Sequence, residues 1–189
     1  MKDDLTALKA SLAACSPVPL TVNKLARLVP QLALGASPNW LFTSGKPNRY
    51  NPAGVNCVYF AETRDIAQAE YDDYWKGLWG ANQPVTTYFA EARLQRVLDL
   101  TDKVTLKALR VDSIDLFKNW RRAKHPTLTQ LLGQAVSETG IFSAIRYPSK
   151  TTAGRGQAGV NLVIFRGCVH SPDTVRILGP DRKPPQEWP

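Results

Sequence analysis

The chain has 189 residues, of which 43% are hydrophobic and 21% are charged. These values are typical of a globular protein with one domain and a substantial core, and no repeat or low-complexity linker interrupts them. The excess of 24 Lys and Arg over 16 Asp and Glu gives a formal charge of +8. Such a charge favours anionic partners: a nucleotide, a nucleic acid, an acidic protein or an anionic membrane surface. A basic solvated face without a specific partner is the alternative.

The three cysteines, Cys15, Cys57 and Cys168, form no close pair and no Cys/His cluster. The sequence therefore predicts neither a disulfide framework nor a zinc site, and we expect no bound metal. No stretch approaches the roughly 20 apolar residues of a membrane helix. The start of the chain, Met1 to Asp4, carries acids where a secretion signal carries bases. We therefore expect a cytoplasmic protein that does not enter a membrane.

The first part of the chain, about residues 1–38, has leucines at helical spacing. This pattern predicts one helix over 4–14 and a second over 21–34. Prolines at 17 and 19 end the first helix, and the Gly-Ala-Ser-Pro sequence at 35–38 ends the second. A short apolar piece at 39–44 is a candidate strand.

A turn-rich loop at 45–54 leads into an apolar strand at 55–61 and then into a helix that begins near Asp65. Thr63 can cap this helix. Its apolar face includes Ile66, Ala67 and Ala69, and Glu70 lies at the edge of that face. A carboxylate in this position is either a satisfied structural group or a functional one.

Further elements follow in mixed order, without a regular alternation of strand and helix. We expect strands at 85–90, 97–100, 104–106, 141–147, 160–165 and 175–178, and helices at 114–124 and 127–140. The proline-rich segment 171–189 is expected to form a C-terminal tail. The mixture predicts an α+β fold with a partly antiparallel sheet, in one domain whose core spans about residues 40–170.

Several local patterns indicate no specific function. The sequence 154–159 matches Gly-x-Gly-x-x-Gly by letter but precedes a strand, whereas a dinucleotide-binding loop joins a strand to a helix. His125 and His170 are expected to be surface residues. The basic run 118–124 contains Trp120, as nucleic-acid grooves do, but a helix with one solvated face explains it as well. We do not expect direct binding of nucleic acid.

Three polar residues are the candidate catalytic set: Arg49 in the turn-rich loop, Glu70 in the helix and Ser149 after a predicted strand. A guanidinium and a carboxylate that face one cleft suit a ligand with an anionic part and a part that becomes cationic during reaction. Each residue also has a structural alternative. The arginine could bind carbonyl groups, the carboxylate could be capped, and the serine could stabilise a turn.

The short sequence motifs around these residues resemble those of the RES domain family. The first half of the resemblance is Arg-Tyr-Asn-Pro-Ala-Gly at 49–54, Val-Tyr-Phe-Ala-Glu at 58–62 and Ile-Ala-Gln-Ala-Glu at 66–70. The second half is Tyr-Pro-Ser at 147–149, followed by the strand at 159–165. It covers roughly residues 40–170, and the family takes its name from an arginine, a glutamate and a serine.

The resemblance implies a fold similar to ADP-ribosyltransferases, with a split, mostly antiparallel sheet flanked by helices. It also implies a bacterial toxin that consumes NAD and is paired with a helix-turn-helix antitoxin. NAD is then a substrate, consumed by hydrolysis or phosphorolysis of its nicotinamide–ribose bond. Glu70 would stabilise the cationic sugar, Arg49 would bind the pyrophosphate, and Ser149 would bind the ribose or the nicotinamide amide.

Two tyrosines complete the expected site. Tyr59 is a candidate platform for the nicotinamide ring, and Tyr50 is a candidate lining residue, with core packing as the alternative for both. Two other functions stay open. The protein could transfer ADP-ribose to a protein target, or it could be a basic module without catalysis that binds nucleic acid or a partner.

Overall fold

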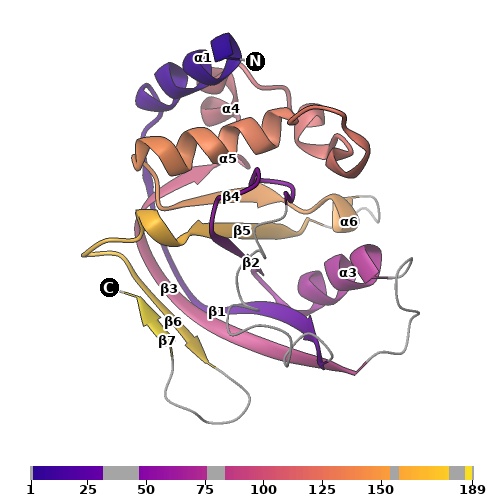
Figure 1. The fold of residues 1–189 in the computed structure, drawn as a ribbon. Helices are drawn as coiled ribbons and strands as arrows, with labels where there is room; N and C mark the ends of the chain where they lie inside the picture. The colour runs from indigo at the N-terminus through magenta and orange to yellow at the C-terminus, as the bar shows by residue number, and fades with distance from the viewer. Residues whose placement is uncertain (1, 32–46, 76–83, 154–157, 179–185, 189) are drawn as a thin grey trace.

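The computed structural model describes residues 2–31, 47–75, 84–153, 158–178 and 186–188. The larger elements are α1 (Lys2–Ala13), β1 (Val18–Pro30), β2 (Cys57–Ala61), α3 (Arg64–Trp75), β3 (Val85–Asp99), α4 (Lys103–Leu109), α5 (Leu128–Thr139), β4 (Ala144–Pro148), α6 (Lys150–Ala153), β5 (Val160–Phe165), β6 (Thr174–Leu178) and β7 (Gln186–Trp188). Three short 3-10 turns, η1 (Ser113–Phe117), η2 (Trp120–Arg122) and η3 (Arg166–Cys168), join them. The fold is of the α+β class, as the sequence predicted (Figure 1).

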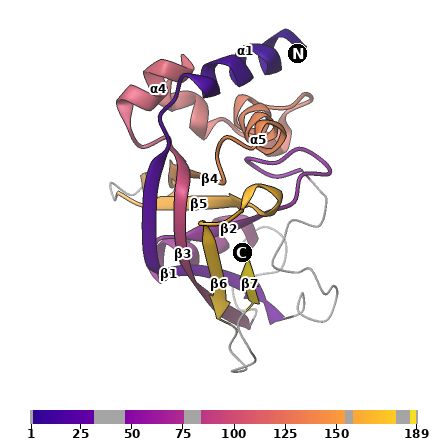
Figure 2. The ribbon, with the colours of Figure 1, turned by 90° about the vertical axis from the view of Figure 1, so that its left-hand side faces the viewer.

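The strands form one sheet in the order β1-β2-β5-β4-β3-β6-β7. Strand β1 also pairs with β3, so the first five strands of this order close into a ring. Figure 2 shows β1 and β3 running side by side along their length. Among the described residues, β3 and β4 are parallel and the other pairings are antiparallel.

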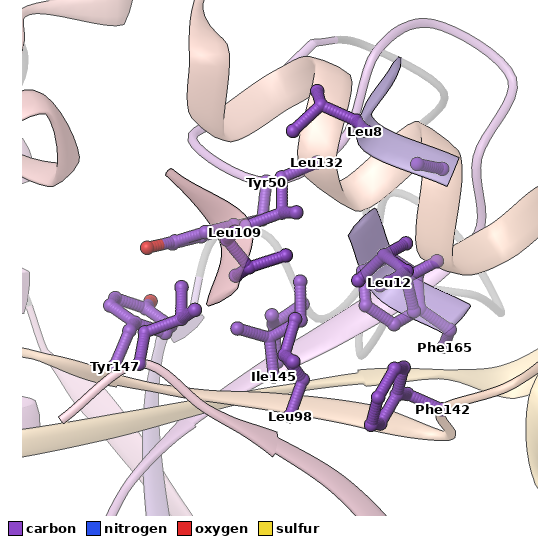
Figure 3. Packing of buried hydrophobic residues seen from close by; sticks show 14 of the residues in the cluster. Leu8, Leu12, Tyr50, Leu98, Leu109, Leu132, Phe142, Ile145, Tyr147 and Phe165 are labelled. Atoms are coloured by element: carbon purple, nitrogen blue, oxygen red, sulfur yellow. The ribbon is translucent and has the colours of Figure 1, made fainter. Parts of the chain in front are cut away.

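Helices α1, α4 and α5 form a layer over β4 and β5 (Figure 1). Their apolar side chains make the larger core with the strands beneath them, because each helix buries one face. Figure 3 shows part of this core, with Leu8 and Leu12 from α1, Leu132 from α5 and Ile145 from β4. A second core fills the space between the strands of the ring and includes Leu25, Phe60 and Leu162.

Helix α3 packs elsewhere, against β1, β2 and β3, through a small cluster that includes Ala26, Ala61 and Ala67. The small side chains let the helix approach the strands closely. The hydroxyl of Thr63 accepts a hydrogen bond from the backbone N–H of Ile66 at 3.2 Å, which satisfies one donor of the first turn. The predicted start and cap of this helix are thus confirmed.

The predicted helix over 21–34 is wrong where the chain is described, because residues 18–30 form β1. This strand is covered on both faces. Leu25 and Val29 point into the ring core, whereas Ala26 and Leu28 pack in the α3 cluster. A register shift between Val22 and Leu25 further disturbs the two-residue period. The spacing of the buried residues in β1 therefore resembles that of a helix. The candidate strand at 39–44 lies outside the described residues.

Other boundaries also differ from expectation. Residues 97–99 belong to the long strand β3, and residues 104–106 lie in α4, where the side chain of Asp102 accepts from two backbone N–H groups and caps the helix. The predicted helix over 114–124 is two 3-10 turns, because Asp112 and Asn119 each start a separate turn. In the tail, the strand at 175–178 is confirmed as part of β6, and β7 was not predicted.

Candidate functional site

Glu70 is the centre of a cluster of polar side chains from three segments. Its Oε1 atom accepts a hydrogen bond from the Ser149 hydroxyl at 2.6 Å and another from the Asn161 amide at 2.9 Å. Both bonds go to the same oxygen. Within the described ranges, no side chain donates a hydrogen bond to the other oxygen, Oε2. The carboxylate is half-buried. It is therefore oriented by the protein while one oxygen stays available to a ligand.

The strand pairing explains why Ser149 and Asn161 reach the same carboxylate. Strands β4 and β5 are antiparallel, with Tyr147 opposite Asn161, and the backbone N–H of Ser149 donates to the Gly159 carbonyl at 2.8 Å. The Ser149 hydroxyl also accepts from the Thr152 N–H at 3.3 Å, at the start of α6. Ser149 is 1% exposed. In this conformation it positions Glu70, and the contact with ribose or nicotinamide that the resemblance implies stays a prediction.

Arg49 lies in a loop that is fixed mainly through its backbone. Asn48 and Asn51 pair across the turn, and the Asn48 side chain accepts from the Arg49 N–H at 2.8 Å. Gln130 of α5 accepts from the Thr127 N–H and donates to the Asn48 carbonyl at 3.0 Å, which ties the loop to the helix. Among the described residues, the Arg49 guanidinium donates one bond, at 2.9 Å, to the Leu116 carbonyl. This is the carbonyl contact of the structural alternative, and it leaves further N–H groups for an anion.

The same loop packs tightly on α5. A Cβ atom at Gly133 would lie 1.6 Å from the Tyr50 carbonyl oxygen, so only glycine permits this approach. The Tyr59 hydroxyl accepts from the Tyr50 N–H at 2.9 Å and donates to the Asn51 side chain at 2.9 Å. Tyr59, which lies in β2, thus fixes the loop to the sheet. Its half-buried ring is a structural support, and contact with a nicotinamide ring stays a prediction.

Tyr50 is fully buried and packs in the core, which is the alternative that the sequence left open. Its ring centroid is 4.4 Å from that of Tyr147 (Figure 3), and its hydroxyl has no hydrogen-bond partner in the described parts of the chain. Burial raises the pKa of both phenols. The Glu70 carboxylate further raises the pKa of Tyr147, and the Arg49 guanidinium lowers it. Tyr147 lies opposite Asn161, which binds Glu70, and its ring contacts that of Tyr50, the neighbour of Arg49, so the segments of the predicted glutamate and arginine meet at Tyr147.

Arg27 of β1 belongs to the same region and was missed in the sequence. Its guanidinium donates to the Tyr59 carbonyl at 3.0 Å, and its buried Nε has no partner among the residues that the structure describes. Burial lowers the pKa of Arg27, whereas Cys57, Tyr59 and Tyr147 raise it from nearby. Arg27 as a whole is half-buried, but a buried donor such as its Nε is costly to leave unpaired unless an anion or another acceptor binds it. Because residues 21–34 were predicted as a helix, no signal directed attention to Arg27.

A groove of about 1050 Å³ adjoins this region and is called the basic groove below. The described residues that line it are Pro47, Pro52, Ala53, Asp73, Tyr74, Trp120, Arg121, Ala123, Lys124, His125, Pro126 and Gln130. Both histidines of the chain are exposed, as expected, and His125 is one of the lining residues. Among the described side chains, no group of three or more His, Cys, Asp and Glu is placed to hold a metal ion.

Comparison with known proteins identifies the family. The model of the RES domain matches residues 26–187, which is most of the chain. The chain therefore belongs to the RES domain family. No curated protein matches the sequence. Within the described residues, no helix is both long enough and apolar enough to span a membrane.

A solved structure shows a similar fold. The chain resembles one from the crystal structure of the M. tuberculosis MbcT–MbcA toxin–antitoxin complex, with a TM-score of 0.60 and 15% sequence identity. The match covers 84% of this chain and 81% of the other. At this identity the similarity establishes the fold.

Proposed function

We propose that this RES-domain protein is a toxin that consumes NAD by cleaving the bond between nicotinamide and ribose. The observation that carries the proposal is the Glu70 carboxylate, which Ser149 and Asn161 hold by one oxygen while the other is free of protein side chains in the described ranges. Membership of the RES domain family supports it, and so does the toxin–antitoxin complex that contains the similar structure. An ADP-ribosyltransferase-like sheet and a cytoplasmic location belong to the same proposal.

The reaction needs negative charge next to the sugar. When the bond between ribose C1 and the nicotinamide nitrogen breaks, its electron pair leaves with nicotinamide, which becomes neutral. The sugar becomes an oxocarbenium-like cation, as in glycoside cleavage. Glu70 would accept a hydrogen bond from a ribose hydroxyl and stabilise the developing cation. Water then adds to give ADP-ribose and a proton, or phosphate adds to give the sugar phosphate.

The two arginines would bind the anionic part of NAD. Arg49 has guanidinium N–H groups beyond the one on Leu116, and Arg27 has a buried Nε without a protein partner in the described residues. Guanidinium groups bind phosphate oxygens through paired, charge-assisted hydrogen bonds. A pyrophosphate between them would leave the nicotinamide riboside end toward Glu70. This arrangement fits the meeting of the Arg49 and Glu70 segments at Tyr147.

We also propose a protein antitoxin as partner, of the helix-turn-helix type that the family resemblance implies. The similar structure comes from a complex of a toxin with its antitoxin, which supports a partner of this kind. The net charge of +8 favours an acidic binding surface on it. Binding would be observed by co-expressing the chain with the protein encoded beside its gene and testing whether growth arrest is relieved.

The central experiment incubates the purified protein with NAD, with and without phosphate, and follows nicotinamide release. Release in buffer without phosphate indicates hydrolysis, and release that requires phosphate indicates phosphorolysis. Transfer of label from adenine-labelled NAD to protein would instead indicate an ADP-ribosyltransferase. Absence of nicotinamide release under all conditions would overturn the proposal and leave the basic module without catalysis.

A further inference from the structure

The basic groove combines aromatic and cationic side chains in a way that the proposed cleavage step does not use. The Arg121 guanidinium lies 4.9 Å from the ring centroid of Tyr74 and 5.4 Å from that of Trp120, so it is shared by two aromatic rings. Trp120 is half-buried, and Lys124 is exposed beside it. Asp73 is the acidic residue among the described lining residues, and its carboxylate forms an ion pair with the Arg121 guanidinium at 3.7 Å. Aromatic faces beside unbalanced positive charge are suited to a nucleotide base and its phosphate.

The groove and the Glu70 site share helix α3, which contributes Asp73 and Tyr74 to the groove. Tyr74 lies four residues after Glu70, which places both side chains on the same face of the helix. The proposed sugar-binding carboxylate and the aromatic wall of the groove are therefore one helical turn apart. A ligand that reaches Glu70 can extend along this face into the groove.

The groove is also continuous with the Arg49 loop. Pro47, Pro52 and Ala53 of that loop line the groove together with Tyr74. Arg49 itself binds the carbonyl of Leu116, four residues before Trp120. The guanidinium proposed to hold the pyrophosphate is thus tied to the segment that leads to Trp120. In NAD the pyrophosphate joins nicotinamide riboside to adenosine, so a guanidinium tied to this segment suits a ligand that binds both Glu70 and the groove.

We infer that the basic groove binds the adenosine half of the dinucleotide, with adenine against Trp120 and Tyr74 and its phosphate near Lys124. This inference rests on the proposed function for the identity of the ligand. The cavity volume of about 1050 Å³ lies just above the usual range of small-molecule sites, about 300–1,000 Å³, so the space admits an adenosine. The half-buried Trp120 stacks on the adenine base, and the exposed Lys124 attracts the phosphate.

The direct test measures AMP binding to the full chain by calorimetry, because AMP cannot be cleaved at a nicotinamide bond. Trp120→Ala should weaken AMP binding about tenfold, since base–aromatic stacking contributes on this order, and Trp120→Phe should retain most of it. Lys124→Ala should weaken AMP binding less than Trp120→Ala does. Lys107→Ala makes an equal change of charge at an exposed position of α4 and should leave AMP binding unchanged. Thermal unfolding of each variant shows whether it is folded.

A kinetic test separates the groove from the cleavage site. NAD and nicotinamide mononucleotide share the scissile bond, but the mononucleotide lacks the adenosine half. Trp120→Ala should raise KM for NAD about tenfold and leave kcat/KM for the mononucleotide unchanged. Equal losses for both substrates would overturn the inference. So would the absence of AMP binding to the native protein, or preferential binding of single-stranded RNA over AMP.

Failure of this inference and failure of the proposed function give different results. If AMP binds and depends on Trp120 while NAD is not cleaved, the groove is an adenylate site and the proposed reaction is wrong. If nicotinamide is released but AMP does not bind, the reaction stands and the groove assignment is wrong.

Discussion

The two sides of the site are held in different ways. Glu70 is oriented by two side chains, Ser149 directly after β4 and Asn161 in the neighbouring strand β5. The Arg49 loop is fixed by its backbone, through Gln130, the Tyr59 hydroxyl and the close approach to Gly133. The orientation of the Glu70 carboxylate can therefore change when one hydrogen bond is lost. The position of the Arg49 loop depends on packing, and disturbing that packing lowers the stability of the fold.

This difference predicts two kinds of variant. Changes around Glu70 should alter turnover and leave the fold intact, whereas changes under the Arg49 loop should lower stability first and NAD affinity as a consequence. Arg27 is an exception on the guanidinium side, because its buried Nε has no protein partner in the described residues.

On the guanidinium side, the largest effect is expected for Arg27→Leu. Loss of a charge-assisted hydrogen bond to phosphate should raise KM for NAD about 100-fold. Stability should change little, because removing an incompletely paired buried charge offsets the loss of the bond to the Tyr59 carbonyl. Steady-state kinetics and thermal unfolding measure the two effects. An unchanged KM with a large loss of stability would show that Arg27 is only structural.

Gly133→Ala tests the packing of the Arg49 loop. The new methyl group would overlap the Tyr50 carbonyl, and such overpacking should lower the free energy of unfolding by about 2 kcal/mol. Gly167→Ala is the matched control, because a Cβ there meets nothing within 4 Å. Urea titration compares the two. If both variants are equally stable, the loop is not held as described.

Ser149→Ala tests the support of Glu70. The carboxylate would lose its 2.6 Å hydrogen bond, and kcat should fall about tenfold with little change in the unfolding temperature. Ser143→Ala removes an equally buried hydroxyl, one that binds the Arg96 carbonyl, and should leave kcat unchanged. A similar fall in kcat for both serines would remove Ser149 from the site.

Tyr59→Phe should have the smallest effect, a loss of about 1 kcal/mol of stability from the two hydrogen bonds of its hydroxyl. Its pKa is raised above the ordinary value, mainly by burial. Its contribution is therefore complete below about pH 10 and is lost as the pH rises toward the folded-state pKa. Native stability should fall more steeply above that pH than stability of the variant. Parallel curves in denaturant titrations would contradict this.

Much of the site could be predicted from the sequence because its parts have local signals. The turn residues at 49–54, the apolar strand before α3 and the position of Glu70 at the edge of an apolar helical face are each visible in a short window. Asn161 has a weaker signal, as a polar residue within an otherwise apolar strand.

The rest depended on contacts between distant segments. Strand β1 imitates a helix because Leu25 and Ala26 face two different cores, and only the closure of the ring places them there. Arg27 could not be chosen while its segment was assigned to a helix. The support that Tyr59 gives to the Arg49 loop depends likewise on a side-chain bond across the site.

The most direct measurement of the central claim is nicotinamide release from NAD by the native protein and by Glu70→Gln. The substitution keeps the shape of the side chain and removes its charge, so release should fall by about 100-fold or more while the unfolding temperature stays close to native. Asp65→Asn, an exposed change of the same charge on α3, should release nicotinamide at the native rate. Native turnover in a folded Glu70→Gln protein would contradict the role assigned to this carboxylate.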